Sequence, residues 1–412
     1  MRRTIVRSAL ASLVVAVALG AFVAGPVGAQ DTPTTTSASN GAPKTPSGDQ
    51  AIDDLVGCVQ GSRRLLVLFL IDESASLKQT DPENRRVDAA RGALDSLVAL
   101  SSAEGSASPK VDVALAAFSN EYRLVKDWTS ASAETAPDLN TSLDEFAHFN
   151  KGIDTDFVNA LSAGRESLAD QAAAVTKTGD AAPCRAVMLF TDGGYDLAVR
   201  TPEDQKVLGL TKPYAPGLKL NTRASVAKAE LMGRKALCDP GGLADQIRSD
   251  DITMLTVALS GSVARRAQLP LAAATTGKAD DYTCGSQPKA GEVTRSQGAY
   301  LPAQDVDLLI SQFDGVGTRL AGGNAIPGNP AVRVCDDQPC EEGTRIFTLD
   351  PTLRRAHILA LPPKPGAVVQ IDGPGSGSVK VSKAGKFTVT VTGTAPLGKA
   401  RSKSTLTLEV TK

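Results

Sequence analysis

Residues 64–76 constrain the fold more than any other stretch, because an unbroken apolar run ends there in a row of oxygen-bearing side chains. Residues 65–71 contain no polar side chain, which is typical of a strand buried on both faces of a parallel sheet. Asp72, Ser74 and Ser76 follow at alternate positions. Open α/β sheets bind ligands outside the carboxyl ends of their strands. The stretch therefore predicts an α/β domain with a binding site beginning at Asp72.

Apolar strand patterns alternate with helical patterns over residues 56–318, which predicts a doubly wound, mostly parallel sheet. A tight turn at Asn120 and Glu121 predicts one hairpin within this domain. Asp81 and Pro82 are expected to begin a helix as N-cap and first helical residue. The expected strands lie at 64–71, 111–119, 122–128, 186–190, 251–258 and 299–301, and the expected helices at 81–100, 142–149, 155–174, 263–274 and 304–316.

The N-terminal 29 residues have the pattern of a secretory signal peptide, with early arginines, an apolar stretch over 9–24 and small residues before Gln30. An uncleaved membrane anchor is the alternative, and membrane contact is expected only through this segment. Residues 30–55 are expected to form a disordered linker because they are rich in Thr, Ser, Pro and Gly. We therefore expect a secreted or extracytoplasmic protein that is either released or associated with the cell surface.

Two further regions depart from the α/β pattern. Residues 325–412 contain short runs with period-two character separated by Gly and Pro, which predicts a β-sandwich of about seven strands. Residues 195–237 lengthen one crossover far beyond what a parallel pair of strands needs. This insertion is basic, and it is either a solvated surface excursion or a lid beside the binding site. The net charge of −1 and the lack of a basic block argue against a nucleic-acid partner.

Asp72 and Asp192 each follow a predicted buried strand. If these strands flank the point where the strand order reverses, both carboxylates converge on one position. Ser74 and Ser76 add hydroxyls, and a further oxygen could come from the loop at 152–155. An oxygen-only set of ligands favours Mg²⁺, with Mn²⁺ or Ca²⁺ as alternatives, over zinc. Such a site can leave one position open for a carboxylate from outside.

The arrangement resembles the von Willebrand factor A domain with its metal-ion-dependent adhesion site. The family motif Asp-x-Ser-x-Ser corresponds to Asp72, Ser74 and Ser76, and the family's Thr-Asp-Gly corresponds to Thr191-Asp192-Gly193. The family's metal-binding threonine corresponds to Thr155, just before a predicted helix. The resemblance implies that Asp72, Ser74, Ser76, Thr155 and Asp192 hold the cation. It also implies an exported bacterial adhesion protein whose cation coordinates an acidic residue of a protein ligand.

The six cysteines are expected to form three disulfides in an exported protein. In the family that the chain resembles, the strands near 64 and 185 are neighbours, which implies a Cys58–Cys184 bond. Cys335 and Cys340 are close in sequence and are expected to close a small loop. Cys238–Cys284 then follows by elimination.

Enzymatic readings have little support in the sequence. The chain contains only two histidines, His148 and His357, in different predicted domains, and no nucleophile–His–acid triad can be assembled. A Mg²⁺-dependent phosphohydrolase with Asp72 as nucleophile is the enzymatic alternative, although Ser74 stands where that chemistry usually has a second acid. A structural cell-envelope scaffold, with a mainly stabilising metal, is the non-enzymatic alternative. We expect a binding protein rather than an enzyme.

Overall fold

The computed structural model divides into two compact units, Val27–Ile310 and Met1–Pro26 with Ser311–Lys412. The residues that it describes are 15–20, 48–101, 108–177, 179, 181–192, 194–259, 265–287 and 298–303, and seven strands between 323 and 410. Within these ranges, no helix combines the length and the apolar character that a bilayer crossing requires.

The first unit is built on a six-stranded sheet with strand order β4-β3-β2-β5-β6-β9. Its strands are β2 (Arg64–Asp72), β3 (Lys110–Phe118), β4 (Tyr122–Ser130), β5 (Cys184–Thr191), β6 (Ile252–Leu259) and β9 (Ala299–Ala303). The β3–β4 pair is antiparallel, as the predicted hairpin requires, and the other pairs are parallel. The predicted α/β fold with a mostly parallel sheet is confirmed. The strand order reverses between β2 and β5, so this pair marks the switch point.

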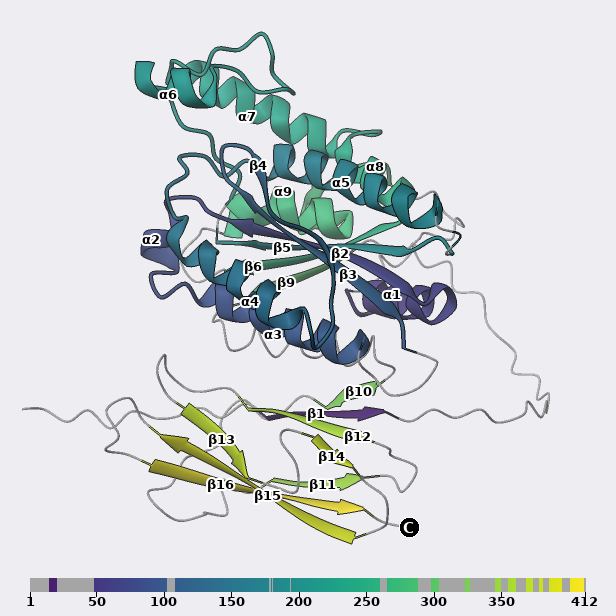
Figure 1. The fold of residues 1–412 in the computed structure, drawn as a ribbon. Helices are drawn as coiled ribbons and strands as arrows, with labels where there is room; N and C mark the ends of the chain where they lie inside the picture. The colour runs from purple at the N-terminus through teal and green to yellow at the C-terminus, as the bar shows by residue number, and fades with distance from the viewer. Residues whose placement is uncertain are drawn as a thin grey trace, which may run out of the picture. The chain divides into compact units, whose positions relative to one another are not determined.

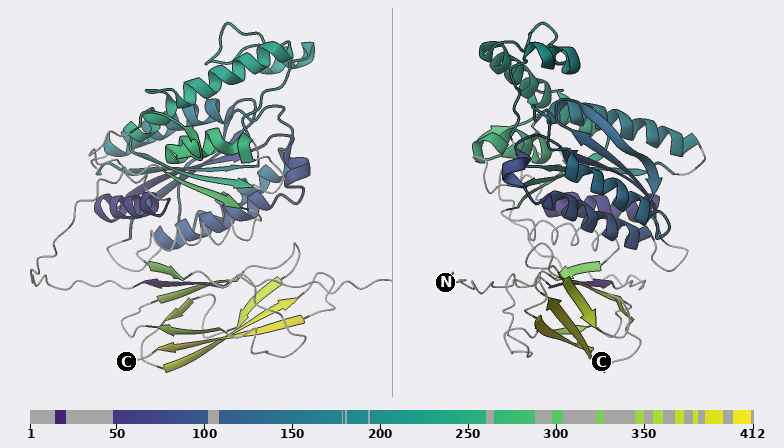
Figure 2. Two further views of the ribbon diagram at one scale, coloured as in Figure 1. Left: turned by 180° about the vertical axis from the view of Figure 1, so that it is seen from behind. Right: turned by 60° about the vertical axis from the view of Figure 1, so that its left-hand side comes forward.

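Helices cover both faces of the sheet (Figures 1 and 2). One face carries α5 (Phe157–Lys177), α7 (Arg223–Cys238), α8 (Leu243–Ser249) and α9 (Arg265–Thr276). The other carries α1 (Gly48–Ser62), α3 (Arg85–Ser101) and α4 (Ala136–Asp144). The predicted helices over 155–174 and 263–274 are confirmed as α5 and α9, whereas the one expected over 304–316 lies outside the described residues.

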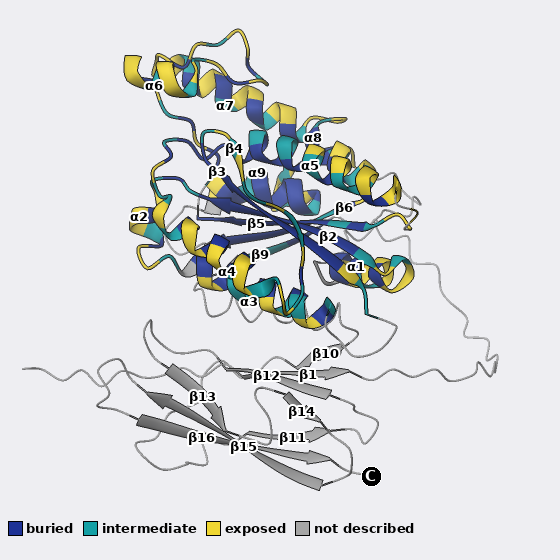
Figure 3. Cartoon of the chain, in the orientation of Figure 1, coloured by how far each residue is buried: buried dark blue, intermediate teal, exposed yellow. Residues whose placement is uncertain are grey.

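The core lies on the central strands (Figure 3). Every residue of β2 after Arg64 is buried, as the apolar run predicted. Leu66, Leu68 and Leu70 alternate along β2 and pack in one cluster with residues of α5. Gly164 allows this close packing, because a Cβ atom there would lie 2.9 Å from a methyl carbon of Leu68. Helix α5 therefore packs close against β2 and fixes the strand that ends at Asp72.

Three expected boundaries differ from the structure. Helix α1 occupies residues 48–55 of the predicted linker, since Ala51, Leu55 and Val59 recur at helical spacing and are buried. Helix α3 begins at Arg85 rather than at Asp81. The Asp81 carboxylate still accepts from the backbone N–H of Arg86 in the first turn of α3, at 3.1 Å, and it also pairs with the Arg86 guanidinium. The helix expected over 142–149 is also shifted: α4 ends at Asp144 and a 3₁₀ turn, η1, spans Glu145–His148.

Two of the three expected disulfides are present. Cys58–Cys184 joins α1 to the start of β5, and Cys238–Cys284 joins the end of α7 to the loop after β8 (Tyr282–Thr283), which pairs with β7 (Lys278–Ala279). Cys335 and Cys340 lie outside the described residues. Cys58–Cys184 lies at the start of β5, opposite to the end where Asp192 follows that strand.

The second unit contains two four-stranded sheets with orders β10-β1-β12-β14 and β11-β16-β15-β13. Its strands are β1 (Val15–Gly20), β10 (Gly323–Ile326), β11 (Arg345–Leu349), β12 (Arg355–Ala360), β13 (Val368–Asp372), β14 (Ser378–Lys380), β15 (Gly385–Thr394) and β16 (Arg401–Val410). Strand β1 lies within the predicted signal peptide and pairs with β10 and β12. The β-sandwich and the signal peptide stay predictions.

Candidate metal centre

Two buried carboxylates meet at the carboxyl ends of neighbouring strands. Asp72 is the last residue of β2, and Asp192 directly follows β5. The two strands are paired in parallel up to Ile71 and Phe190. Both aspartates have no exposed surface. The switch point of the sheet therefore brings together the two acids that the sequence placed at strand ends.

Hydroxyl and amide groups connect these two carboxylates. The backbone N–H of Ser74 donates to Oδ1 of Asp72 at 2.7 Å. The hydroxyls of Ser74 and Ser76 are hydrogen-bonded at 2.9 Å, and the Ser76 hydroxyl donates to Oδ1 of Asp192 at 3.2 Å. Four of the five residues expected in the site thus form one continuous hydrogen-bonded chain, and Ser76 is its exposed member.

Two threonines that were not predicted as site residues extend this series of hydrogen bonds. The Thr191 hydroxyl donates to Oδ2 of Asp72 at 2.6 Å, and the Thr80 hydroxyl donates to Oδ2 of Asp192. Thr80 ends the short helix α2 (Leu77–Thr80), one helical turn after Ser76. That four-residue spacing is the signal that could have identified Thr80, because residues i and i+4 of a helix share a face.

Thr155 is placed by backbone contacts in a loop beside Ser74. Its N–H donates to the carbonyl of Asp196 at 2.8 Å, and the carbonyl of Gly152 accepts from Ala75 at 2.7 Å. Gly152 lies so close to the β3–β4 turn that a Cβ atom there would be 1.8 Å from a side-chain oxygen in that turn. The Thr155 side chain is buried. The structure places the threonine loop against the Asp72–Ser76 loop, and the role of the Thr155 hydroxyl as a ligand stays a prediction.

Electrostatic repulsion is built into the pair of acids. Burial, together with the charge of Asp192, raises the pKa of Asp72 to about 7. Burial also raises the pKa of Asp192, and hydrogen bonds from Thr80 and Ser76 oppose that rise. Two buried carboxylates at one position are unfavourable unless a cation or a proton compensates them.

The donor set fits a hard divalent cation. It offers two carboxylates and several hydroxyls, and Mg²⁺ is usually bound by one or two carboxylates together with other oxygen ligands. The described residues contain no group of three or more His, Cys, Asp or Glu side chains of the kind that holds many other metals. The chemistry of the site is thus that of an oxygen-ligated ion of modest protein charge.

Arg86 holds the backbone of the site in place. Its guanidinium is buried, donates to the main-chain carbonyl of Asp72 at 3.3 Å, and pairs with Asp81 at 2.8 Å. It also donates to the carbonyl of Phe146 at 2.9 Å. Sequence reasoning missed this residue, because its partners come from three separate segments of the chain.

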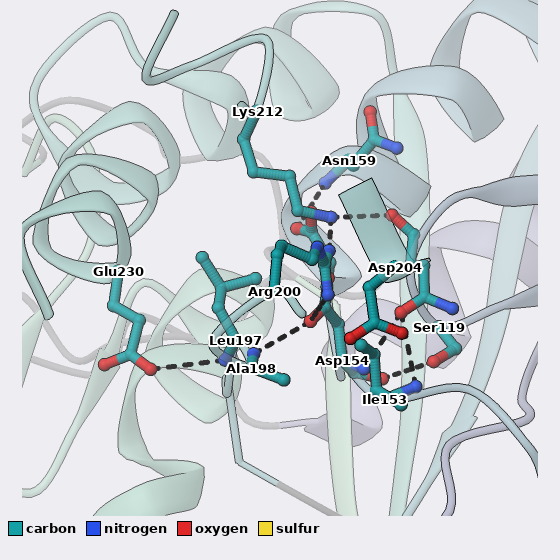
Figure 4. Close-up of polar contacts among 12 residues, drawn as sticks. Ser119, Ile153, Asp154, Asn159, Leu197, Ala198, Arg200, Asp204, Lys212 and Glu230 are labelled. Carbon is teal, nitrogen blue, oxygen red and sulfur yellow. Dashed lines mark hydrogen bonds and ion pairs between the residues drawn. The ribbon is translucent and has the colours of Figure 1, made fainter. Parts of the chain in front are cut away.

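The insertion at 195–237 contributes α6 (Pro202–Leu208) and α7. It also brings two buried basic side chains next to the threonine loop (Figure 4). Arg200 and Lys212 are 3% and 5% exposed and pair with Asp154. For these two residues the expectation of a solvated surface excursion is wrong. Other basic residues of the insertion, such as Lys206 and Lys228, are exposed.

Comparisons with known proteins were made for the sequence and for the structure. A comparison with curated protein sequences gave no match. Among solved structures, the chain is similar to the PilB minor pilin from Streptococcus sanguinis, with 13% identity, a TM-score of 0.40, and coverage of 64% of this chain and 62% of the pilin. It is also similar to proximal thread matrix protein 1 from the mussel byssus, with 11% identity, a TM-score of 0.36, and coverage of 64% and 48%. The chain thus spans less than two thirds of either protein.

A third similar structure is the pilus adhesin SpaC from Lactobacillus rhamnosus GG in its open conformation, with 13% identity, a TM-score of 0.39, and coverage of 84% of this chain and 37% of the adhesin. The family model of the von Willebrand factor type A domain matches residues 67–194. This range begins inside β2 and ends just after Asp192, so it spans the strands that carry both acids. The chain therefore contains a von Willebrand factor type A domain over these residues.

Proposed function

We propose that Asp72, Ser74, Ser76, Thr155 and Asp192 hold a divalent cation, most readily Mg²⁺, and that the protein uses it to bind an acidic residue of a protein ligand outside the cytoplasm. The observation that carries this proposal is the convergence of Asp72 and Asp192, both fully buried, at the switch point of the sheet. A buried pair of like charges raises the free energy of the folded state, and a bound cation would remove that penalty.

Each residue has a distinct part in this proposal. Asp72 and Asp192 supply the negative charge, and the hydroxyls of Ser74 and Ser76 supply neutral oxygen ligands directly or through water. Thr191 and Arg86 fix the Asp72 carboxylate and its backbone. A cation held with only two protein carboxylates keeps enough positive charge to accept a carboxylate from a partner. The exposed Ser76 marks the side from which a partner can approach.

The proposed role is adhesion or assembly rather than catalysis. The two disulfides in the α/β unit agree with an extracytoplasmic location, since disulfides persist in oxidising compartments. Because the metal ion itself binds the partner's carboxylate, this protein needs no basic surface to bind such a partner. The chemistry expected of the partner is a solvent-exposed Asp or Glu that can reach a metal ion recessed between two loops.

The test is a calorimetric titration of the purified chain with Mg²⁺ and with Mn²⁺, alongside an Asp192→Ala variant. The proposal expects one site in the parent and none in the variant. Retained binding in Asp192→Ala, or no binding in the folded parent, would overturn it. An Asp72→Ala variant then separates the two roles of the metal: loss of adhesion supports ligand coordination, whereas loss of thermal stability alone supports a scaffold.

A further inference from the structure

The insertion forms hydrogen bonds and ion pairs with three consecutive residues, of which the middle one is the threonine of the proposed metal site. Residues 154–156 each bond to the insertion, and the middle one does so through its backbone: the N–H of Thr155 donates to the carbonyl of Asp196. On one side of Thr155, the carboxylate of Asp154 accepts hydrogen bonds from both terminal nitrogens of Arg200 and from the backbone N–H of Ala198 at 2.9 Å. This attachment is made entirely by residues of the 195–237 segment.

The other side of Thr155 is fastened by a lysine that serves two carboxylates. Nζ of Lys212 lies 2.9 Å from Oδ2 of Asp154 and 2.9 Å from Oδ2 of Asp156, and it donates to the carbonyl of Asn120 at 2.6 Å. The Tyr214 hydroxyl donates to Asp156 at 2.9 Å. Lys212 therefore crosslinks the threonine loop, the β3–β4 turn and the insertion.

This arrangement is costly to disrupt because its members are buried. Asp154 and Asp156 are each 1% exposed. Burial raises the pKa of Asp156, and the positive charge of Lys212 opposes that rise. Removing one partner of a buried ion pair leaves an uncompensated charge in a medium that solvates it poorly. Among the described residues, the basic side chains that pair with Asp154 and Asp156 both come from the insertion, and the conformation of residues 154–156 thus depends on them.

We propose that Arg200 and Lys212 are positioning residues, and that the insertion acts as a clamp which holds the Thr155 loop in register with the Asp72–Ser76 loop. The clamp makes the cation affinity of the site depend on the insertion; this consequence rests on the proposed function. Groups that hold metal ligands in place affect metal affinity by roughly 10–100-fold when they are removed. The insertion is thereby an internal part of the metal centre rather than a cover over it.

The test compares Lys212→Met with Lys228→Met, which makes the same charge change at an exposed position of the same insertion. Two quantities are measured: the Mn²⁺ dissociation constant by calorimetry, and amide hydrogen exchange at residues 152–156 in the metal-free protein. We expect Lys212→Met to weaken Mn²⁺ binding roughly 10–100-fold. We also expect exchange at residues 152–156 to become about tenfold faster or more, because hydrogen bonds to charged groups are lost there. Lys228→Met should match the parent in both.

Equal exchange and equal Mn²⁺ affinity in the two variants would overturn the clamp. If the folded parent binds no Mn²⁺, the proposed function fails, and the exchange data alone decide whether the clamp exists. Should Lys212→Met fail to fold, Tyr214→Phe replaces it. This variant removes the hydroxyl that donates to Asp156 and accepts from the Tyr195 hydroxyl, and it leaves both ion pairs of Lys212 in place. Faster exchange at residues 152–156 in Tyr214→Phe supports the clamp, and exchange at the parent's rate contradicts it.

Discussion

The α/β unit contains two pairs of buried aspartates at the same end of its sheet, and they are compensated in opposite ways. Asp154 and Asp156 are neutralised by Arg200 and Lys212 from the insertion. The carboxylates of Asp72 and Asp192, by contrast, accept from hydroxyls and backbone N–H groups. The first pair is a finished ion-pair network. The second has the acids and the neutral oxygens of a cation site. Burial raises the pKa of Asp192 and the charge of Arg86 opposes that rise, but Arg86 forms its ion pair with Asp81, so a bound ion or a proton would complete the compensation.

The largest effect should come from removing one of the positive charges that compensate Asp154 and Asp156. Arg200→Met leaves the buried Asp154 carboxylate with Lys212 as its only ion-pair partner in the described residues. We expect the free energy of unfolding to fall by about 3–5 kcal/mol. Urea denaturation followed by circular dichroism measures the change. Lys206→Met, an exposed charge removal in the same insertion, is the matched control and should leave the midpoint unchanged.

The contribution of Asp72 and Asp192 to stability should instead depend on pH. Burial and Asp192 raise the pKa of Asp72 to about 7 in the folded chain, from its usual 3.8. Between these values the folded state holds a proton that the unfolded state has released. The free energy of unfolding of the metal-free protein should therefore fall as the pH rises through this window, by on the order of 4 kcal/mol.

This dependence is measured by urea unfolding in EDTA at several pH values, with Asp72→Asn as the reference. The variant lacks the titrating group, so the stability of the parent relative to the variant should decrease with rising pH. A constant difference in unfolding free energy between the two proteins across the window would contradict the account that burial beside Asp192 raises the pKa of Asp72.

A bound cation should remove the repulsion between the carboxylates of Asp72 and Asp192. At a Mg²⁺ concentration of about 100 times the dissociation constant, binding to the folded state raises the free energy of unfolding by about 2.7 kcal/mol. Asp192→Asn should show no such Mg²⁺-dependent rise. Thermal unfolding with Mg²⁺ and with EDTA provides the measurement. A rise of equal size in Asp192→Asn would place the stabilising ion elsewhere.

The smallest effect concerns the hydroxyl that sequence reasoning missed. Thr80→Val keeps the side-chain shape but removes the hydroxyl that donates to Oδ2 of Asp192, and the Ser76 hydroxyl still donates to Oδ1. We expect the metal-free protein to lose about 1 kcal/mol of unfolding free energy. Chemical denaturation in EDTA measures this loss, and Thr141→Val, at an exposed helix position, is the matched control. A gain in stability would show that the Thr80 hydrogen bond does not stabilise Asp192.

The positions of Asp72 and Asp192 could be predicted because they depend on local pattern and one general rule. Buried parallel strands are recognisable as apolar runs, and the carboxyl ends of such strands meet at one edge of the sheet. Helix α1 was also visible in principle, since Ala51, Leu55 and Val59 repeat at helical spacing. The linker interpretation gave more weight to composition than to this period.

The clamp could not be predicted, because it depends on which residues meet across long sequence separations. Arg200 and Lys212 are two of many basic residues in the insertion, and nothing in the local sequence distinguishes them from the exposed Lys206 and Lys228. Their burial follows from the fold of the insertion over the threonine loop. Arg86 was missed for the same reason: its partners are contributed by three separate segments.

The most direct test of the difference between the two acid pairs is anomalous diffraction from crystals of the chain grown with Mn²⁺. The account predicts one strong anomalous peak between Asp72 and Asp192, with Ser74 and Ser76 beside it. It predicts no peak at Asp154 and Asp156, where Lys212 and Arg200 already supply the positive charge. A peak at the Asp154–Asp156 pair, or none at Asp72 and Asp192 in Mn²⁺-saturated crystals, would contradict the central claim.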